Sequence, residues 1–203
     1  MLVRRQLILS SLVVLSLAGA SEALADSSGG AGTGGRAPGG ASPGAGAPVG
    51  QQPGTRSHPT VPGYRAKIIH GVAYAPSMAP IQVKRAIWAG NKIRHKPYIY
   101  GGGHGSFKDA GYDCSGSVSY VLHAAGLVKT PMDSSEFMSW GRHGKGHWIT
   151  VFTNPGHAFV QMAGIRFDTS AEGDPHPPPG SGPRWRPLMA HIAGFMARHP
   201  KKF

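Results

Sequence analysis

A segment without aromatic residues divides the chain and limits what can fold. From Asp26 to about Gly63 the sequence is dominated by Gly, Ala, Pro and Ser and has few large apolar side chains. Such a segment buries too little apolar surface to offset the entropy lost on folding, so we expect a flexible linker over residues 26–63. All four Trp, all six Tyr and all seven Phe follow it. Residues 64–203 therefore hold the core, and about 140 residues is the size of one domain.

The first 25 residues have the pattern of a secretory signal peptide. Arg4 and Arg5 precede an apolar run over residues 7–20, and the small-x-small sequence at residues 23–25 predicts cleavage before Asp26. The run is too short and wrongly flanked for a stable membrane span, so we expect none after cleavage. The paired arginines leave twin-arginine export open beside the general route. We therefore expect a protein that is secreted, periplasmic or associated with the cell wall.

The predicted domain is strongly basic. It has 17 Lys and Arg against 7 Asp and Glu, a formal charge of +10. Exported basic domains are attracted to anionic polymers. The basic residues are scattered along the chain and form no single tract. This favours a solvated surface suited to anionic cell-wall polymers over a nucleic-acid groove, and we expect no nucleic-acid partner.

Hydrophobic periodicity predicts helices first and strands afterwards. Apolar residues at helical spacing indicate helices over 80–93 and from Cys114 to about Gly126. Residues 133–140 have the Asp and Glu of a short capped helix. Three later segments have the residue types of strands, with turns between them: 148–152, 157–164 and 165–170. This order predicts an α+β domain in which N-terminal helices pack on a central antiparallel sheet.

Cys114 is the only cysteine in the chain and begins the second predicted helix. The free N–H groups and positive dipole end at a helix start favour a thiolate, which is the nucleophilic form. Ser115 and Gly116 are small and are expected to leave the sulfur accessible. Two other interpretations stay open, a buried structural cysteine and a disulfide with another molecule, because a single thiol cannot make an internal disulfide.

The last two predicted strands bring a base and an acid together. With a two-residue turn at 163–164, residue 159 lies opposite Asp168, which makes Asp168 the diagonal neighbour of His157 on one face of the sheet. A base oriented by a third polar group is what a cysteine nucleophile needs. A bulge or a turn of odd length would break this geometry. The competing interpretation is a surface histidine and a turn aspartate.

Three blocks of the sequence resemble the NlpC/P60 family of cysteine hydrolases. They are PYIYGG at 97–102, YDCSG at 112–116 and PGHAFVQMAGIRFDTS at 155–170. The resemblance spans roughly residues 80–170 and implies a papain-like fold, in which the cysteine heads a helix packed on an antiparallel sheet. The chain after residue 170 has no counterpart in it. We expect the PRWRP and GFMARHP runs of that tail to add edge strands or to cover the site.

The resemblance assigns roles to these residues. It implies that Cys114 is the nucleophile, His157 the base and Asp168 the residue that orients the base. It also implies an oxyanion site at the start of the helix, around Ser115, with the hydroxyl of Tyr100 rather than that of Tyr98 beside the thiol.

The activity that the resemblance implies is hydrolysis of an amide bond in peptidoglycan stem peptides or muropeptides, without a cofactor. The bond most often cut in such enzymes joins γ-D-glutamate to diaminopimelate or lysine. An amidase that cleaves between N-acetylmuramic acid and L-alanine would use the same chemistry, and a non-catalytic cell-wall-binding module is a second alternative. A zinc site is a third: His143 and His147 are four residues apart. Gly and Lys between them are poor helix material and no second cysteine is present, so we expect no metal.

Overall fold

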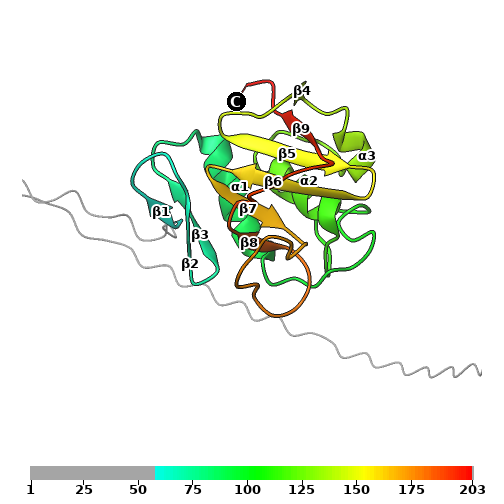
Figure 1. The fold of residues 1–203 in the computed structure, drawn as a ribbon, viewed down its shortest axis with the longest axis horizontal. Coiled ribbons are helices and arrows are strands. Elements are labelled where there is room, and N and C mark those ends of the chain that lie inside the picture. Colours follow the sequence, from blue (N-terminus) through cyan, green and yellow to red (C-terminus); the bar gives the residue numbers. More distant parts are fainter. Residues whose placement is uncertain (1–57, 203) are drawn as a thin grey trace, which may run out of the picture. The chain divides into compact units, whose positions relative to one another are not determined.

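A computed structural model describes residues 58–202 of the chain. The predicted signal peptide and the predicted linker as far as residue 57 lie outside the described residues. The described part contains a small three-stranded sheet, three helices and a six-stranded sheet (Figure 1). Within residues 58–202, no helix is long and apolar enough to cross a membrane.

The small sheet begins inside the segment predicted as linker. It consists of β1 (Thr60–Val61), β2 (Lys67–Ile69) and β3 (Val72–Pro76), with β1 parallel and β2 antiparallel to β3. The predicted boundary at Tyr64 is therefore too late by several residues. Main-chain hydrogen bonds hold β1 to β3, and the Trp88 ring stacks on His58 with 4.3 Å between centroids. Composition does not reveal this pairing, because a strand joined through its backbone needs few apolar side chains.

The three helices lie where the sequence predicts them. They are α1 (Ile81–Ile93), α2 (Cys114–Ala124) and α3 (Ser134–Phe137). Gly126 has a φ of 72° just after α2, the left-handed conformation that lets a glycine end a helix. Asp133 and Glu136 form a capping box on α3, in which each side chain accepts a hydrogen bond from the other residue's N–H.

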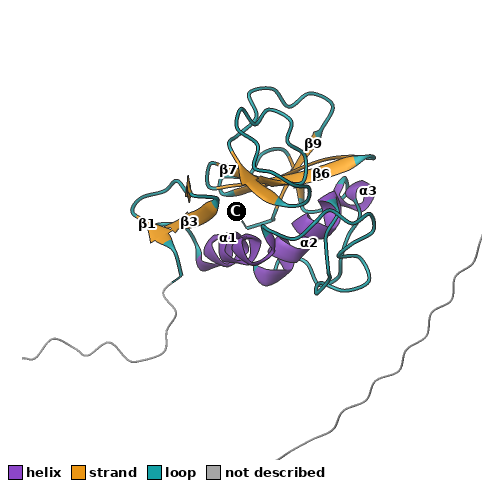
Figure 2. Ribbon diagram, turned by 90° about the horizontal axis from the view of Figure 1, so that it is seen from below, coloured by secondary structure: helices purple, strands orange, loops and turns teal. Residues whose placement is uncertain are grey.

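The large sheet is antiparallel throughout and confirms the predicted α+β class. Its order is β4-β9-β5-β6-β7-β8. The three helices lie on one side of it (Figure 2). The strands are β4 (Arg142–His143), β5 (Ile149–Asn154), β6 (His157–Met162), β7 (Ile165–Asp168), β8 (Arg184–Arg186) and β9 (Met196–His199).

The tail beyond residue 170 supplies two strands and covers part of the sheet. β8 is an edge strand beside β7, as predicted for PRWRP. β9 lies between β4 and β5 and is not an edge strand. Between these strands the chain crosses the face of the sheet away from the helices (Figure 1), where Phe195 packs edge-on against Phe159. The central strands are therefore buried on both faces.

Asn91 and Gly90 join three parts of the fold on α1. The Asn91 amide accepts a hydrogen bond from the Ala73 N–H and donates one to the Ala73 carbonyl of β3. Its oxygen also accepts the indole N–H of Trp185 on β8, at 2.9 Å. Beside it, a Cβ built on Gly90 would lie 2.4 Å from Cζ2 of Trp185. The indole ring thus packs directly on the helix backbone.

This close approach predicts that Gly90→Ala destabilises the protein, although alanine is the better helix former by about 1 kcal/mol. The buried, rigid indole cannot move aside, and overpacking of this kind costs roughly 1–3 kcal/mol. We expect a lower denaturant midpoint with an unchanged slope. Arg85→Ala, at an exposed position of the same helix, is the control and should shift the free energy of unfolding by no more than about 0.5 kcal/mol. Equal stability of the Gly90→Ala protein and wild type would contradict the packing.

Candidate active site

Cys114 is the first residue of α2, and Asp113 caps the helix. The Asp113 carboxylate accepts the N–H of Gly116 at 2.7 Å and, through its other oxygen, the N–H of Gly101 at 3.1 Å. The carboxylate thus joins the helix start to the glycine-rich loop before it. The cysteine is 9% exposed, so the sulfur lies in a cavity wall and not on an open surface.

The small size of Gly116 was expected to leave the sulfur accessible, but the structure shows that it allows close backbone packing. A Cβ at this position would lie 2.0 Å from the carbonyl oxygen of Gly102. The absence of a side chain therefore lets the loop 101–103 pack against the first turn of α2. Gly116 places the loop beside the cysteine and does not serve to uncover the sulfur.

The β6–β7 hairpin forms with the predicted register. Val160 pairs with Phe167 and Met162 with Ile165 across a two-residue turn. Both turn residues have positive φ, 49° at Ala163 and 89° at Gly164, as the tight turns that suit the twist of a hairpin require. This register places residues 157 and 168 on the same face of the sheet.

His157 and Asp168 are hydrogen-bonded as the hairpin predicted. Nε2 of His157 lies 2.9 Å from Oδ1 of Asp168, and the N–H of Ser170 donates to the same oxygen at 2.9 Å. The carboxylate is almost completely buried, whereas the imidazole is about one quarter exposed. Since Asp168 occupies Nε2, Nδ1 is the ring nitrogen left for the hydrogen bond between His157 and Cys114. The three residues form one hydrogen-bonded chain.

Electrostatics favour a thiolate and an imidazolium in this chain. Burial raises the pKa of the Cys114 thiol, but hydrogen bonds from His157 and from the N–H of Ala158 lower it, as does the charge of His157, so the pKa lies below its ordinary value of 9.0. Burial also lowers the pKa of His157, but hydrogen bonds and charges of Asp168 and Cys114 raise it from 6.5 to about 9. Both shifts favour the thiolate–imidazolium pair over the neutral thiol and imidazole.

Cys114 lines a cavity of about 480 Å³ between the glycine-rich loop and the turn before β6. Its lining includes Tyr98, His104, Asp113, Ser134 and Pro155. None of the described residues that line it is Lys or Arg. We call it the catalytic cavity below. Its walls come from four separate segments of the chain, which only the tertiary structure brings together.

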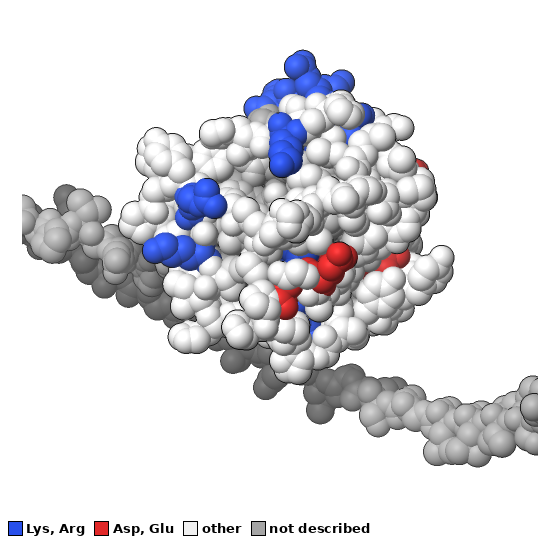
Figure 3. Space-filling view, viewed as in Figure 1, with Lys and Arg blue, Asp and Glu red and all other residues white. Residues whose placement is uncertain are grey.

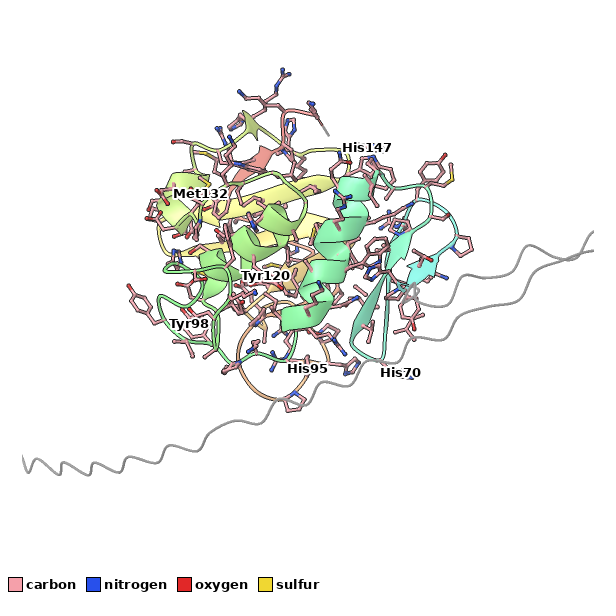
Figure 4. All side chains as sticks on the ribbon, turned by 180° about the vertical axis from the view of Figure 1, so that it is seen from behind. His70, His95, Tyr98, Tyr120, Met132 and His147 are labelled. Atoms are coloured by element: carbon pink, nitrogen blue, oxygen red, sulfur yellow. The ribbon has the colours of Figure 1, made fainter. Side chains whose placement is uncertain are left out.

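Two tyrosines are candidates for the hydroxyl beside the thiol, Tyr98 and Tyr100. The charge of Cys114 is among the causes that raise the pKa of Tyr98, after burial of the phenol. Tyr98 is 40% exposed, whereas Tyr100 is 91% exposed. Both line the catalytic cavity, and Tyr98 lies on the side of the domain away from the small sheet that carries His70 (Figure 4). The role of the Tyr100 hydroxyl therefore stays a prediction, with Tyr98 as the second candidate.

A second histidine–aspartate pair lies next to Cys114. Nε2 of His104 is 3.0 Å from Oδ1 of Asp113 and 3.2 Å from Oγ of Ser115. No motif in the sequence singles out His104. The signal that could have revealed the pair is the strong preference of Asp for the cap position before a helix, which directs the Asp113 carboxylate toward the loop that contains His104.

Metal-ligand geometry is not found in the described part of the chain. His143 belongs to β4 and His147 to the loop after it, so their spacing of four does not place them on one helix face. Within residues 58–202 no group of three His, Cys, Asp or Glu side chains could hold a metal ion.

Comparison with solved structures finds similar chains. The chain is similar to the solved structure of the peptidoglycan hydrolase RipB from Mycobacterium tuberculosis, with a TM-score of 0.46 and 19% sequence identity. The alignment covers 61% of this chain and 66% of the RipB chain, slightly less than two thirds of the latter. No protein-family model matches the sequence, and no curated protein matches it.

The ion pair predicts that iodoacetamide alkylates Cys114 well below the pH at which a free thiol reacts. His157→Ala removes a hydrogen bond and a positive charge that lower the pKa of the thiol, while its burial remains. The midpoint of the rate against pH should therefore move up by about one unit or more. His104→Ala, which removes another histidine from the same cavity, should leave the midpoint nearly unchanged. Superimposable profiles for His157→Ala and wild type would exclude the pair.

Proposed function

We propose that the chain is an exported cysteine hydrolase of the NlpC/P60 type that cleaves an amide bond in peptidoglycan stem peptides. One observation carries the proposal: Cys114, His157 and Asp168 form a hydrogen-bonded chain whose thiol end opens into the catalytic cavity. A thiolate at a helix start, a base beside it and a buried carboxylate behind the base are the parts that acyl transfer requires.

The proposed reaction proceeds through an acyl-enzyme. The Cys114 thiolate attacks the amide carbonyl carbon, and the carbonyl oxygen becomes an oxyanion. The imidazolium of His157 then gives its Nδ1 proton to the leaving amine as the C–N bond breaks. His157, now neutral, takes a proton from water, which attacks the thioester and releases the acid. Asp168 keeps the ring in one orientation through Nε2 during both steps.

The oxyanion would be held at the start of α2. N–H groups in the first turn have no acceptor within the helix, and here they lie beside the thiol that forms the tetrahedral intermediate. The Ser115 hydroxyl lies within hydrogen-bond distance of Asp113 and His104, so the part of Ser115 that suits the oxyanion is its N–H. The Tyr98 hydroxyl is the side-chain donor best placed to assist.

The distribution of charge suits a peptide carried by an anionic wall. Lys and Arg lie at several places on the surface, one of them near the C-terminal end (Figure 3), while the described lining of the catalytic cavity has none. The surface can therefore bind anionic wall polymers while the cavity admits the peptide. Within this class we propose the bond between γ-D-glutamate and diaminopimelate or lysine, with the N-acetylmuramoyl-L-alanine bond as the alternative.

The decisive experiment is mass spectrometry of soluble muropeptides and intact sacculi after incubation with the chain from Asp26 onward, the predicted secreted form. We expect fragments split after γ-D-glutamate, and none from a Cys114→Ala protein. Free stem peptide separated from the glycan would identify the amidase alternative. A folded wild-type protein that cleaves neither substrate but sediments with sacculi would indicate the binding module instead.

Conservative substitutions can distinguish the roles of the two tyrosines that line the cavity. Tyr98→Phe removes the hydroxyl that we propose as an oxyanion donor, so kcat should fall by roughly tenfold or more. Tyr100→Phe removes a hydroxyl that is exposed to solvent, and kcat should stay within about twofold of wild type. Initial rates of muropeptide cleavage measure both. A larger fall in kcat for Tyr100→Phe than for Tyr98→Phe would identify Tyr100 as the oxyanion donor.

A further inference from the structure

The face of the sheet away from the helices buries an arginine beside the proposed triad. Arg166 lies on β7 two residues before Asp168, so both side chains point to this face. The Arg166 side chain is 0% exposed and that of Asp168 is 1% exposed. A buried guanidinium is costly unless charges and hydrogen bonds compensate for its lost hydration. The partners of Arg166 therefore indicate its role.

Arg166 joins the acid of the triad to the segment that follows β7. Its Nη1 lies 3.3 Å from Oδ2 of Asp168, and its Nη2 donates a hydrogen bond of 2.6 Å to the main-chain oxygen of Glu172. The guanidinium also lies 5.8 Å from the centre of the Phe159 ring. A planar, forked cation can make such contacts at once, which the point charge of a lysine cannot.

The carboxylate of Asp168 therefore has a partner at each oxygen, hydrogen-bonded at Oδ1 and in ion-pair contact without a hydrogen bond at Oδ2. His157 Nε2 and the Ser170 N–H lie at Oδ1, and the Arg166 guanidinium lies at Oδ2. A rotation of the carboxylate that broke the bond to His157 would also pull Oδ2 away from its counter-charge. The plane of the carboxylate, and with it the orientation of the imidazole, is thereby restricted.

A second buried arginine provides a matched comparison. Arg186 of β8 lies opposite Arg166 in the strand register and is 2% exposed. Its Nη1 is 2.9 Å from Oδ2 of Asp174, so its ion pair does not involve the triad. The two arginines share burial, strand setting and an aspartate partner. They differ in the partner, which is Asp168 for Arg166 and Asp174 for Arg186.

We propose that Arg166 is a positioning residue for the proposed hydrolysis: it keeps the Asp168 carboxylate oriented toward His157, and the Glu172 carbonyl of the tail holds Arg166 in place. The inference rests on the proposed function only for its effect on turnover. Its effect on the ion pair of Cys114 and His157 can be measured without substrate.

The expected effect of removing Arg166 has a definite sign. Without the guanidinium, the buried carboxylate loses its contact at Oδ2 and can turn away from His157. Its hydrogen bond and charge, which raise the pKa of His157, are then weakened. The imidazolium becomes less stable, and the pKa of Cys114 rises because that cation lowers it. The thiolate therefore forms at higher pH.

The test measures the rate of Cys114 alkylation by iodoacetamide against pH in Arg166→Met and Arg166→Lys proteins. We expect the midpoint to rise by about half a unit or more in Arg166→Met and by less in Arg166→Lys, which keeps the charge. Because the alkylation assay needs no peptidoglycan, it tests the role of Arg166 even if the protein does not cleave muropeptides. If muropeptides are cleaved, kcat should fall roughly tenfold with KM little changed, since Arg166 does not line the catalytic cavity.

The control removes the other buried pair as a unit, with Arg186→Met and Asp174→Asn together. We expect the Tm to fall about as much as in Arg166→Met, while the midpoint of the alkylation rate against pH stays close to wild type. If Arg166→Met does not fold, Arg166→Lys is tested in two proteins instead. It should raise the midpoint of the alkylation rate against pH in the wild-type chain, and it should cause no further rise in the Asp168→Asn protein. An unchanged midpoint in Arg166→Lys, an equal shift in the control, or the same effect in both backgrounds would overturn the proposal.

Discussion

The hydrogen bond between His157 and Asp168 is the interaction on which the rest of the candidate site depends. It spans the β6–β7 hairpin, and its length of 2.9 Å follows from a register that a two-residue turn imposes. With Nε2 held by a buried carboxylate, the imidazole has only Nδ1 for Cys114, and its pKa is raised to about 9. The charge state of the thiol is thus determined by strands that lie far from it in sequence.

The start of α2 supplies the other half of the site by a separate mechanism. Asp113 caps the helix and also accepts hydrogen bonds from the glycine-rich loop, while Gly116 allows that loop to approach the helix backbone. One wall of the catalytic cavity is therefore built by close backbone packing around the nucleophile. The same carboxylate contacts His104, so the loop and the helix cap form one connected polar group.

Much of the fold could be predicted from the sequence, because local patterns determine local structure. The helix from Cys114 has a cap, an apolar face and a terminating glycine, and the hairpin has alternating residues around a Gly-containing turn. The strand at Thr60–Val61 could not be predicted, since it is held by main-chain bonds to β3 and lies in a segment of linker composition. The interior place of β9 also has no local signal, because strand order depends on distant pairing.

The sequence by itself determined the α+β class, the position of Cys114 at a helix start and the pairing of His157 with Asp168. Each of these depends on residues close together in the chain or joined by one tight turn. Only the tertiary structure decided that Tyr98 and Tyr100 line one cavity with Cys114, that His104 pairs with Asp113 and that Arg166 contacts Asp168 on a face covered by the tail. These contacts depend on loop paths and on burial, and both arise from packing between segments that no local pattern relates.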